Sequence, residues 1–303
     1  YPEHHRFLDK RERLSFEEIT RLATVFARLG VRKLRLTGGE PLLRRELPTL
    51  VQWLAAVAGI DDLALTTNGV LLPRSAAALR AAGLKRLTVS LDSLDPAVFR
   101  RLSGGRGEVA EVLAGIAAAE AAGFARLKLN CVVLRGVNDD GVLDLVQRFR
   151  GTGHILRFIE YMDVGTLNHW QRGSVVPSAD LVARIHARWP LQALDRNYRG
   201  EVAERYAFDD GGGELGFISS VSAPFCGDCS RARISAEGRL YTCLFARDGF
   251  DLRTPLRGGA SDAELADLVA ARWRLRADRY SERRAELRAA GVREKVEMFA
   301  IGG

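Results

Sequence analysis

The chain has 303 residues, a formal charge of +7 and 27% charged residues, which is an ordinary globular balance and enough length for two domains. No apolar run approaches a membrane span and the first residues do not resemble a signal peptide, so we expect a cytoplasmic protein without a membrane partner. The positive charge suggests an anionic partner, but the basic residues are spread over the predicted helices instead of one face, which disfavours nucleic acid.

The first half of the chain alternates between predicted helices and strands. A helix is predicted at 14–30, because Ser15 and Glu18 have capping-box spacing and Gly30 follows the apolar periodicity. Strand-like runs and further helical patterns then alternate. The strand-like runs are 31–37, 63–68, 86–92, 126–134 and 155–163, and the helical patterns are 46–59, 75–83 and 111–123. This alternation predicts a parallel sheet, closed or partly closed.

Polar residues stand at the end of each predicted strand, where parallel α/β sheets carry their active sites. They are Thr37 to Glu40, Thr66 to Asn68, Ser90 with Asp92, Lys128 with Asn130, and Glu160 with Met162. Five polar strand ends in a row indicate a site. Cys131, by contrast, lies inside an apolar run and is expected to be a buried strand residue.

The strand and helix rhythm breaks near residue 170. We therefore expect a first domain at 1–170 and a second, irregular domain at 171–303, which ends in Arg-rich helices. Ser261 and Glu264 have capping-box spacing at the start of one of these helices.

The segment "FCGDCSRARISAEGRLYTCLF", residues 225–245, clusters Cys226, Cys229 and Cys243. Three cysteines in such a cluster indicate a metal or iron-sulfur site rather than disulfides. A structural zinc site needs four protein ligands, so His169 or His186 would have to supply the fourth. A 4Fe-4S cluster needs only three thiolates if its remaining iron binds substrate. A small zinc ribbon with surface arginines stays open as the alternative.

Arg231 and Arg233 follow the second cysteine of this segment. In an extended segment alternate side chains point the same way, so both guanidinium groups are expected to face the same anion.

The motifs "LGVRKLRLTGGEPLLRREL", "LTTNGVLL", "VSLDSLD", "FIEYMDVG", "FCGDCSRARIS" and the terminal "IGG" together resemble the MoaA family. These are the radical S-adenosylmethionine enzymes, GTP 3',8-cyclases, of molybdenum cofactor biosynthesis. The resemblance spans nearly the whole chain. It implies an α/β fold, an incomplete parallel (βα)6 TIM-type barrel, with a C-terminal α+β iron-sulfur domain covering its open side.

The resemblance also implies roles for individual residues. Gly39, Ser90 and Met162 would contact S-adenosylmethionine, and Cys226, Cys229 and Cys243 would bind a C-terminal 4Fe-4S cluster. Six residues match positions that hold GTP: Arg35, Thr66, Lys128, Arg231, Ala232 and Arg233. The tail, Gly302 and Gly303, would reach into the active site.

In this family a lyase reaction converts GTP to (8S)-3',8-cyclo-7,8-dihydroguanosine 5'-triphosphate. A deoxyadenosyl radical takes hydrogen from ribose C3', and the carbon radical closes onto guanine C8. The implied partners are GTP, an electron donor and a downstream cyclic pyranopterin monophosphate synthase, and a homodimer is compatible with the resemblance.

The family's Cys-x3-Cys-x2-Cys motif, which holds a second 4Fe-4S cluster, would precede Tyr1. The chain as given lacks those cysteines, and we expect a truncated segment instead of an evolutionary loss. Three alternatives stay open: a radical enzyme with another substrate, a zinc-stabilised module that binds nucleic acid, and a homologue that binds GTP without catalysis.

Overall fold

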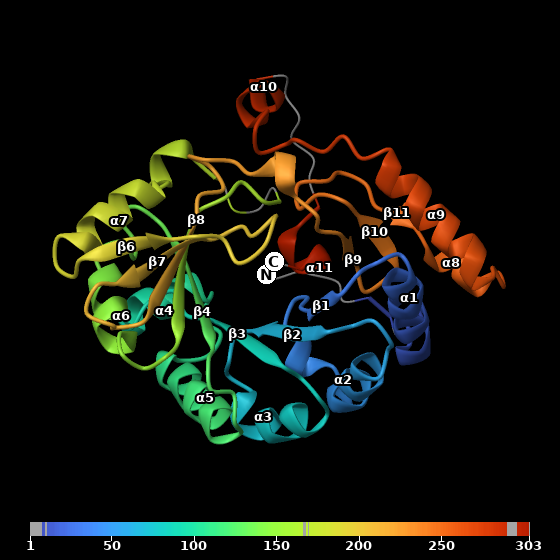
Figure 1. The fold of residues 1–303 in the computed structure, drawn as a ribbon, viewed down its shortest axis with the longest axis horizontal. Coiled ribbons are helices and arrows are strands. Elements are labelled where there is room, and N and C mark those ends of the chain that lie inside the picture. Colours follow the sequence, from blue (N-terminus) through green and yellow to red (C-terminus); the bar gives the residue numbers. More distant parts are fainter. Residues whose placement is uncertain (1–7, 10, 166–167, 169, 290–295, 303) are drawn as a thin grey trace.

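The computed structural model describes residues 8–9, 11–165, 168, 170–289 and 296–302. Its main feature is a curved sheet of eight strands with helices on its outer face (Figure 1). The strands are β1 (Lys33–Leu36), β2 (Asp62–Thr67), β3 (Arg86–Ser90), β4 (Lys128–Val133), β5 (Ile155–Glu160), β6 (Leu191–Leu194), β7 (Glu204–Phe208) and β8 (Glu214–Ile218). Their order is β1-β2-β3-β4-β5-β8-β7-β6.

Six neighbouring strands of this sheet run parallel, from β1 through β5 to β8. β7 pairs antiparallel with β8, and β6 pairs antiparallel with β7. In the described residues β1 and β6 do not pair, so the barrel is incomplete, as expected. The five predicted strands and the capping box of Ser15 and Glu18 are confirmed. The sheet extends past residue 170 through β6–β8, and the division of the chain at that residue stays a prediction.

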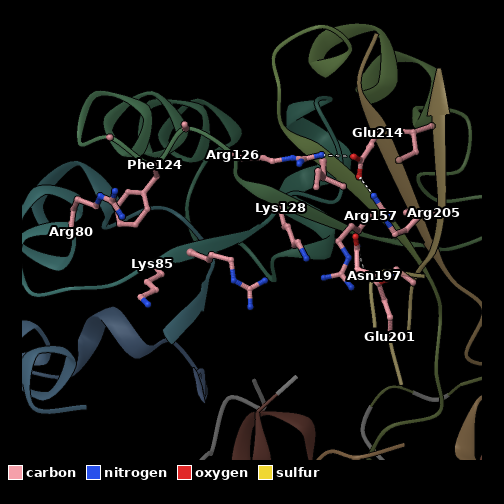
Figure 2. Close-up of a pocket in the computed structure, with 17 residues that line it drawn as sticks. Arg80, Lys85, Phe124, Arg126, Lys128, Arg157, Asn197, Glu201, Arg205 and Glu214 are labelled. Atoms are coloured by element: carbon pink, nitrogen blue, oxygen red, sulfur yellow. Dashed lines mark hydrogen bonds and ion pairs between the residues drawn. The ribbon is translucent and has the colours of Figure 1, made fainter. Parts of the chain in front are cut away.

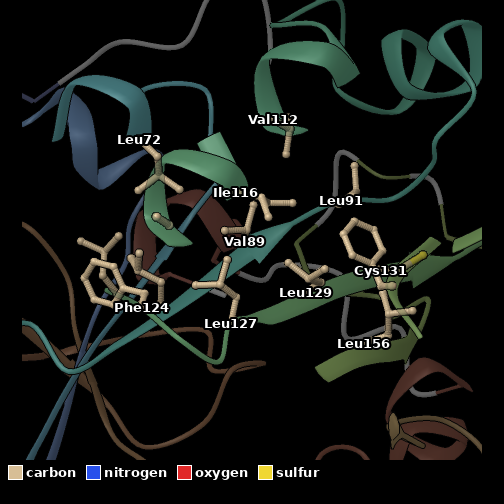
Figure 3. Packing of buried hydrophobic residues seen from close by; sticks show 14 of the residues in the cluster. Leu72, Val89, Leu91, Val112, Ile116, Phe124, Leu127, Leu129, Cys131 and Leu156 are labelled. Atoms are coloured by element: carbon tan, nitrogen blue, oxygen red, sulfur yellow. The ribbon is translucent and has the colours of Figure 1, made fainter. Parts of the chain in front are cut away.

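Helices connect the parallel strands and cover the outside of the barrel (Figure 1). They are α1 (Phe16–Arg28), α2 (Leu47–Ala55), α3 (Leu72–Ala81), α4 (Pro96–Leu102), α5 (Val109–Ala121), α6 (Val142–Phe149) and α7 (Ser178–His186), with 3-10 turns at Pro41–Leu43 and Arg172–Ser174. The main core lies between these helices and the sheet. Figure 3 shows part of it, including Leu72, Ile116 and Leu129. Cys131 is fully buried on β4, as predicted.

The C-terminal part covers the open side of the barrel (Figure 1). Its strands β9 (Arg233–Ile234), β10 (Arg239–Tyr241) and β11 (Phe250–Asp251) form an antiparallel sheet. A 3-10 turn, Cys226–Asp228, precedes them, and α8 (Arg253–Arg257), α9 (Asp262–Arg274), α10 (Arg284–Ala289) and α11 (Met298–Ile301) follow. The predicted capping box of Ser261 and Glu264 begins α9. None of the helices in the described residues combines the length and apolar character that a membrane crossing requires.

A second, smaller core joins this part to α1. Leu22 and Val25 of α1 pack with Leu256 and Leu265. Arg21 donates to Asp262 at 2.9 Å beside them. Burial of these apolar side chains fixes the C-terminal part against α1.

Candidate active site

Basic side chains gather inside the barrel on neighbouring strands. Arg35 of β1 donates through Nη1 to the hydroxyl oxygens of Thr66 on β2, at 2.7 Å, and Thr88 on β3, at 3.1 Å. Thr88 is in turn the register partner of Lys128 on β4. The structure thus brings together three residues predicted to hold GTP, namely Arg35, Thr66 and Lys128. Because Thr66 accepts from Arg35, its own O–H remains able to donate to an anion.

The pKa values of these basic side chains are lowered, because the side chains are buried and other positive charges lie nearby. Burial, and then the charges of Arg157 and Arg86, lower the pKa of Lys128 to about 8. The same causes lower the pKa of Arg35 to about 10. Burial is also the main reason why the pKa of Arg157 is lowered. Side chains that repel one another's positive charge form a strong site for a polyanion, which would relieve the repulsion.

Sequence reasoning missed Arg86 and Arg157, which stand near the starts of β3 and β5. Arg86 is paired with Asp62, and Arg157 interacts electrostatically with Lys128, Arg35 and Arg231. Alternate residues of a strand face the same side of the sheet, and Arg157 alternates with the buried residues Leu156 and Phe158. This alternation could have identified both arginines as side chains that face the barrel interior. Both lie away from the C-terminal strand ends. Lys128, which was expected at such an end, is instead the first residue of β4.

A cavity of about 430 Å³ lies beside these residues, near the N-terminal ends of β3, β4, β5 and β8 (Figure 2). Seven basic residues line it: Arg80, Lys85, Arg86, Arg126, Lys128, Arg157 and Arg205. Glu201 and Glu214 are the acidic residues of its lining, and Glu214 is paired with Arg126 at 2.6 Å and Arg205 at 3.0 Å. The excess of positive charge suits a phosphate-rich ligand.

The predicted S-adenosylmethionine residues lie at or just beyond the C-terminal ends of three strands. Gly39 follows β1, Ser90 ends β3, and Met162 lies two residues beyond β5. Glu40 fixes the turn after Gly39, because its carboxylate accepts from Thr67 Oγ1 and the Asn68 backbone N, both at 2.8 Å. Gly39 is exposed and has no side chain, so a ligand can approach its backbone.

The cysteine segment is shaped by the pairing of β9 with β10. Tyr241 is the register partner of Arg233, so the chain beyond each strand brings Cys243 near Arg231 and Cys229. Arg231 donates to Cys229 Sγ from Nε at 3.3 Å and from Nη2 at 3.2 Å. Burial raises the pKa of Cys229, but the charge of Arg231 and several hydrogen bonds lower it further, to about 7. Burial raises the pKa of Cys243.

The three thiols are half-buried, and a 4Fe-4S cluster fits this donor set. Within the described residues no three His, Cys, Asp or Glu side chains surround one position closely enough for a single metal ion. The thiolates of a 4Fe-4S cluster bind different irons, so they spread more widely than ligands of one ion. The lowered pKa of Cys229 favours the thiolate that iron binds. His169 lies outside the described residues, and His186 accepts from the Leu191 backbone N at 3.0 Å.

The C-terminal tail reaches the end of β1. Gly302 is buried, and its carbonyl accepts from Arg233 Nε at 3.2 Å. At Gly302 φ is +71°, and a Cβ there would lie 2.3 Å from Thr37 Cγ2. Only glycine fits this position without displacing its neighbour. Gly303 lies outside the described residues, and Ala232 is exposed between the two half-buried arginines.

Two family models match this chain. The model of the Radical SAM superfamily matches residues 1–149, and that of Molybdenum Cofactor Synthesis C matches residues 154–282. A solved structure described as native anSMEcpe with bound AdoMet shares the fold, with a TM-score of 0.51 and 15% identity over 75% of this chain and 65% of that one.

Several curated proteins are similar to the chain over nearly all its length. The GTP 3',8-cyclase of Xanthomonas axonopodis pv. citri is 63% identical over 295 residues, which are 97% of this chain and 87% of the relative. The GTP 3',8-cyclase of Acidothermus cellulolyticus is 54% identical over 321 residues, covering 98% and 88%. The enzyme of the same name from Staphylococcus saprophyticus is 43% identical, with the same coverage.

Proposed function

Because this chain belongs to the GTP 3',8-cyclase family of radical S-adenosylmethionine enzymes, we propose that it converts GTP to (8S)-3',8-cyclo-7,8-dihydroguanosine 5'-triphosphate. One observation carries the proposal. Basic side chains form a row between the barrel interior and the cysteine segment. Lys128 lies within electrostatic reach of Arg157, Arg157 lies within electrostatic reach of Arg231, and Arg231 donates to Cys229 Sγ at 3.2 Å. A nucleoside triphosphate has its anionic end and its base at opposite ends, and such a row can orient it.

The triphosphate would lie against Arg35, Lys128 and Arg157. Their charges would neutralise phosphate oxygens, and the Thr66 hydroxyl, which accepts from Arg35, would donate its O–H to one of them. Arg231 and Arg233, with the intervening Ala232, would bind the nucleotide at the cysteine end. Arg35, Thr66, Lys128 and Arg157 stand on neighbouring strands of one sheet, which would hold the nucleotide in one orientation.

Cys226, Cys229 and Cys243 would hold a 4Fe-4S cluster near the guanine base. Gly39, Ser90 and Met162 would hold S-adenosylmethionine at the C-terminal strand ends. When bound, the iron-sulfur and S-adenosylmethionine cofactors of the superfamily supply the radical chemistry. The chain contributes binding, orientation and exclusion of water, and the buried Gly302 closes the site beside Thr37.

Partners and place in the cell follow from the same proposal. The product is a cyclised nucleotide, so an enzyme that rearranges it, a cyclic pyranopterin monophosphate synthase, would act next. An electron donor would reduce the clusters, and a cytoplasmic location suits GTP as substrate. The division into a barrel domain at 1–170 and a C-terminal domain at 171–303 is part of this proposal, as is a homodimer.

The proposal is tested by iron, sulfide and zinc analysis of the protein reconstituted without oxygen, with electron paramagnetic resonance (EPR) spectra of the reduced protein before and after GTP. We expect about four irons bound through the three C-terminal cysteines, and a signal that shifts on adding GTP. Arg231→Ala should weaken GTP binding about tenfold or more while iron content stays unchanged. Stoichiometric zinc without a GTP effect would contradict the proposal and favour the zinc-stabilised module.

A further inference from the structure

A buried polar unit lies directly beside the candidate site. Asp163 follows Met162, and its carboxylate accepts from Tyr280 OH at 2.7 Å and from Arg284 Nε at 2.8 Å. The side chains of Arg284 and Asp163 are only 8% and 2% exposed. Arg284 also donates from Nη1 to the Ser220 carbonyl at 3.1 Å, so it ties the C-terminal part to the chain just beyond β8.

The same unit reaches the cysteine segment through an aromatic stack. The rings of Tyr280 and Phe245 lie 4.6 Å apart at 21°, and the Arg284 guanidinium lies 5.4 Å from the centre of the Phe245 ring. The backbone N of Phe245 donates to Cys243 Sγ at 3.4 Å. Met162 and Cys243 both pack against the cluster of Val164, Phe245 and Tyr280.

Stability alone does not account for a buried ion pair of this kind. Well-packed apolar side chains of similar volume stabilise a fold about as well, because burying two charges carries a large desolvation cost. A hydrogen-bonded pair differs in being directional, since Asp163 satisfies its partners in one arrangement only. Among the described residues, Nη2 of Arg284 is buried and has no hydrogen-bond partner, so its pairing there is incomplete.

We propose that Asp163, Tyr280 and Arg284 are positioning residues that fix Met162 and Cys243 relative to each other, and so set the separation between the S-adenosylmethionine pocket and the C-terminal cluster. The inference rests on the proposed function, which assigns those two ligands to Met162 and Cys243. In the proposed reaction, a hydrogen atom would pass from the ribose to a radical derived from S-adenosylmethionine, while the C-terminal cluster would hold the guanine base. Small errors in this separation are therefore costly for the reaction.

The test is Tyr280→Phe, which keeps the stacked ring and removes the hydroxyl. Tyr206→Phe is the matched control, because Tyr206 packs edge-on against Phe217 and lies outside this unit. For wild type and both variants, the experiment measures iron content, melting temperature, the EPR spectrum of the reduced cluster and the dissociation constant for S-adenosylmethionine. We expect Tyr280→Phe to keep its iron, to change the EPR line shape and to weaken S-adenosylmethionine binding about fivefold. Tyr206→Phe should match the wild type in both readouts.

A purely structural role predicts a different pattern, namely a lower melting temperature with an unchanged spectrum and unchanged affinity, and that pattern would overturn the inference. Should Tyr280→Phe lose iron, Asp163→Asn is measured in the same way, since the amide keeps the size and one acceptor oxygen. A wild-type spectrum and affinity in that variant would also overturn the inference. A wild-type protein that binds no iron would instead overturn the proposed function, so the two failures are distinguishable.

Discussion

Arg233 and Gly302 meet through a hydrogen bond from Nε to the backbone carbonyl at 3.2 Å, although 69 positions separate them in sequence. This contact brings the tail to the arginine pair beside the cysteines. Burial, then the charge of Arg231, lowers the pKa of Arg233 to about 10, so it remains a cation at neutral pH. The tail carbonyl therefore occupies a donor that is expected to serve the nucleotide.

Gly302→Ala should reduce GTP turnover at least tenfold, because the new Cβ would lie 2.3 Å from Thr37 Cγ2 and displace the tail. Iron content should not change, because Gly302 supplies no ligand to the cluster. Gly173→Ala is the control, because no atom of the described residues, apart from the chain neighbours of Gly173, lies within 4 Å of a Cβ built there. Steady-state kinetics with product detection would check this, and wild-type turnover in Gly302→Ala would refute an active role for the tail.

GTP affinity should fall as pH rises through about 8, where Lys128 loses its proton. A bound triphosphate favours the charged amine and raises its pKa, so affinity is full below pH 8 and falls by up to about tenfold per pH unit above it. Lys128→Arg should keep the affinity flat from about pH 7 to 9, because arginine stays protonated. Calorimetric titrations across this range would check it.

The control for this profile is Lys85→Arg at the rim of the same cavity, which should retain the wild-type pH dependence. An equal flattening in both variants would mean that a general loss of lysine charge, and not Lys128, governs the binding.

Cys243→Ala should lose the C-terminal cluster, whereas Cys131→Ala should keep it. Cys131 is fully buried on β4, and its thiol lies 3.5 Å from the Asp92 carbonyl. Replacing it should lower the free energy of unfolding by about 1 kcal/mol through the small cavity left behind. Iron and sulfide analysis of both variants distinguishes the two cysteines, and full iron retention in Cys243→Ala would refute its ligand role.

Asp92 should make the folded state less stable as pH rises from about 4 to 6. Burial raises the pKa of its carboxyl to about 6, against the lowering effect of the hydrogen bond from the Val132 backbone N. The folded value exceeds the unfolded one, so the contribution is complete below about pH 4 and is lost as pH approaches 6. In Asp92→Asn this loss should disappear, as measured by urea unfolding at several pH values.

Asp144→Asn, an exposed change on α6, provides the control and should leave the pH dependence of unfolding unchanged. An identical pH profile for wild type and Asp92→Asn would rule out Asp92 as its cause.

The sequence predicted the first five parallel strands, but it missed β8, the sixth, as well as the antiparallel pair β6 and β7. Strands β1 to β5 carry apolar runs that face helices, and such runs are recognisable without tertiary information. Strands β6 and β7 are short and mostly exposed or half-buried, with little apolar pattern to reveal them. Their place beside β8 depends on pairing that local sequence does not encode.

The candidate site, like the fold, was only partly predictable from the sequence. The spacing of the three cysteines and the two glycines before Glu40 is visible in the sequence. Asp163 and Arg284 are 121 positions apart in the sequence, and no local sequence pattern predicts their pairing. Nothing in the local sequence distinguishes Arg86 and Arg157 from other strand residues, because only the curvature of the sheet brings them together.

The crowded cations of the barrel interior make this protein's stability depend on its metabolic surroundings. Without a bound anion the like charges of Arg35, Lys128 and Arg157 oppose the compact state, and a nucleotide that binds only the folded chain removes this penalty. At a GTP concentration of about 100 times the dissociation constant, binding adds about 2.7 kcal/mol to the free energy of unfolding. In a cell short of purine nucleotides, the unoccupied protein would therefore unfold and be degraded sooner, so its abundance would follow the supply of its substrate.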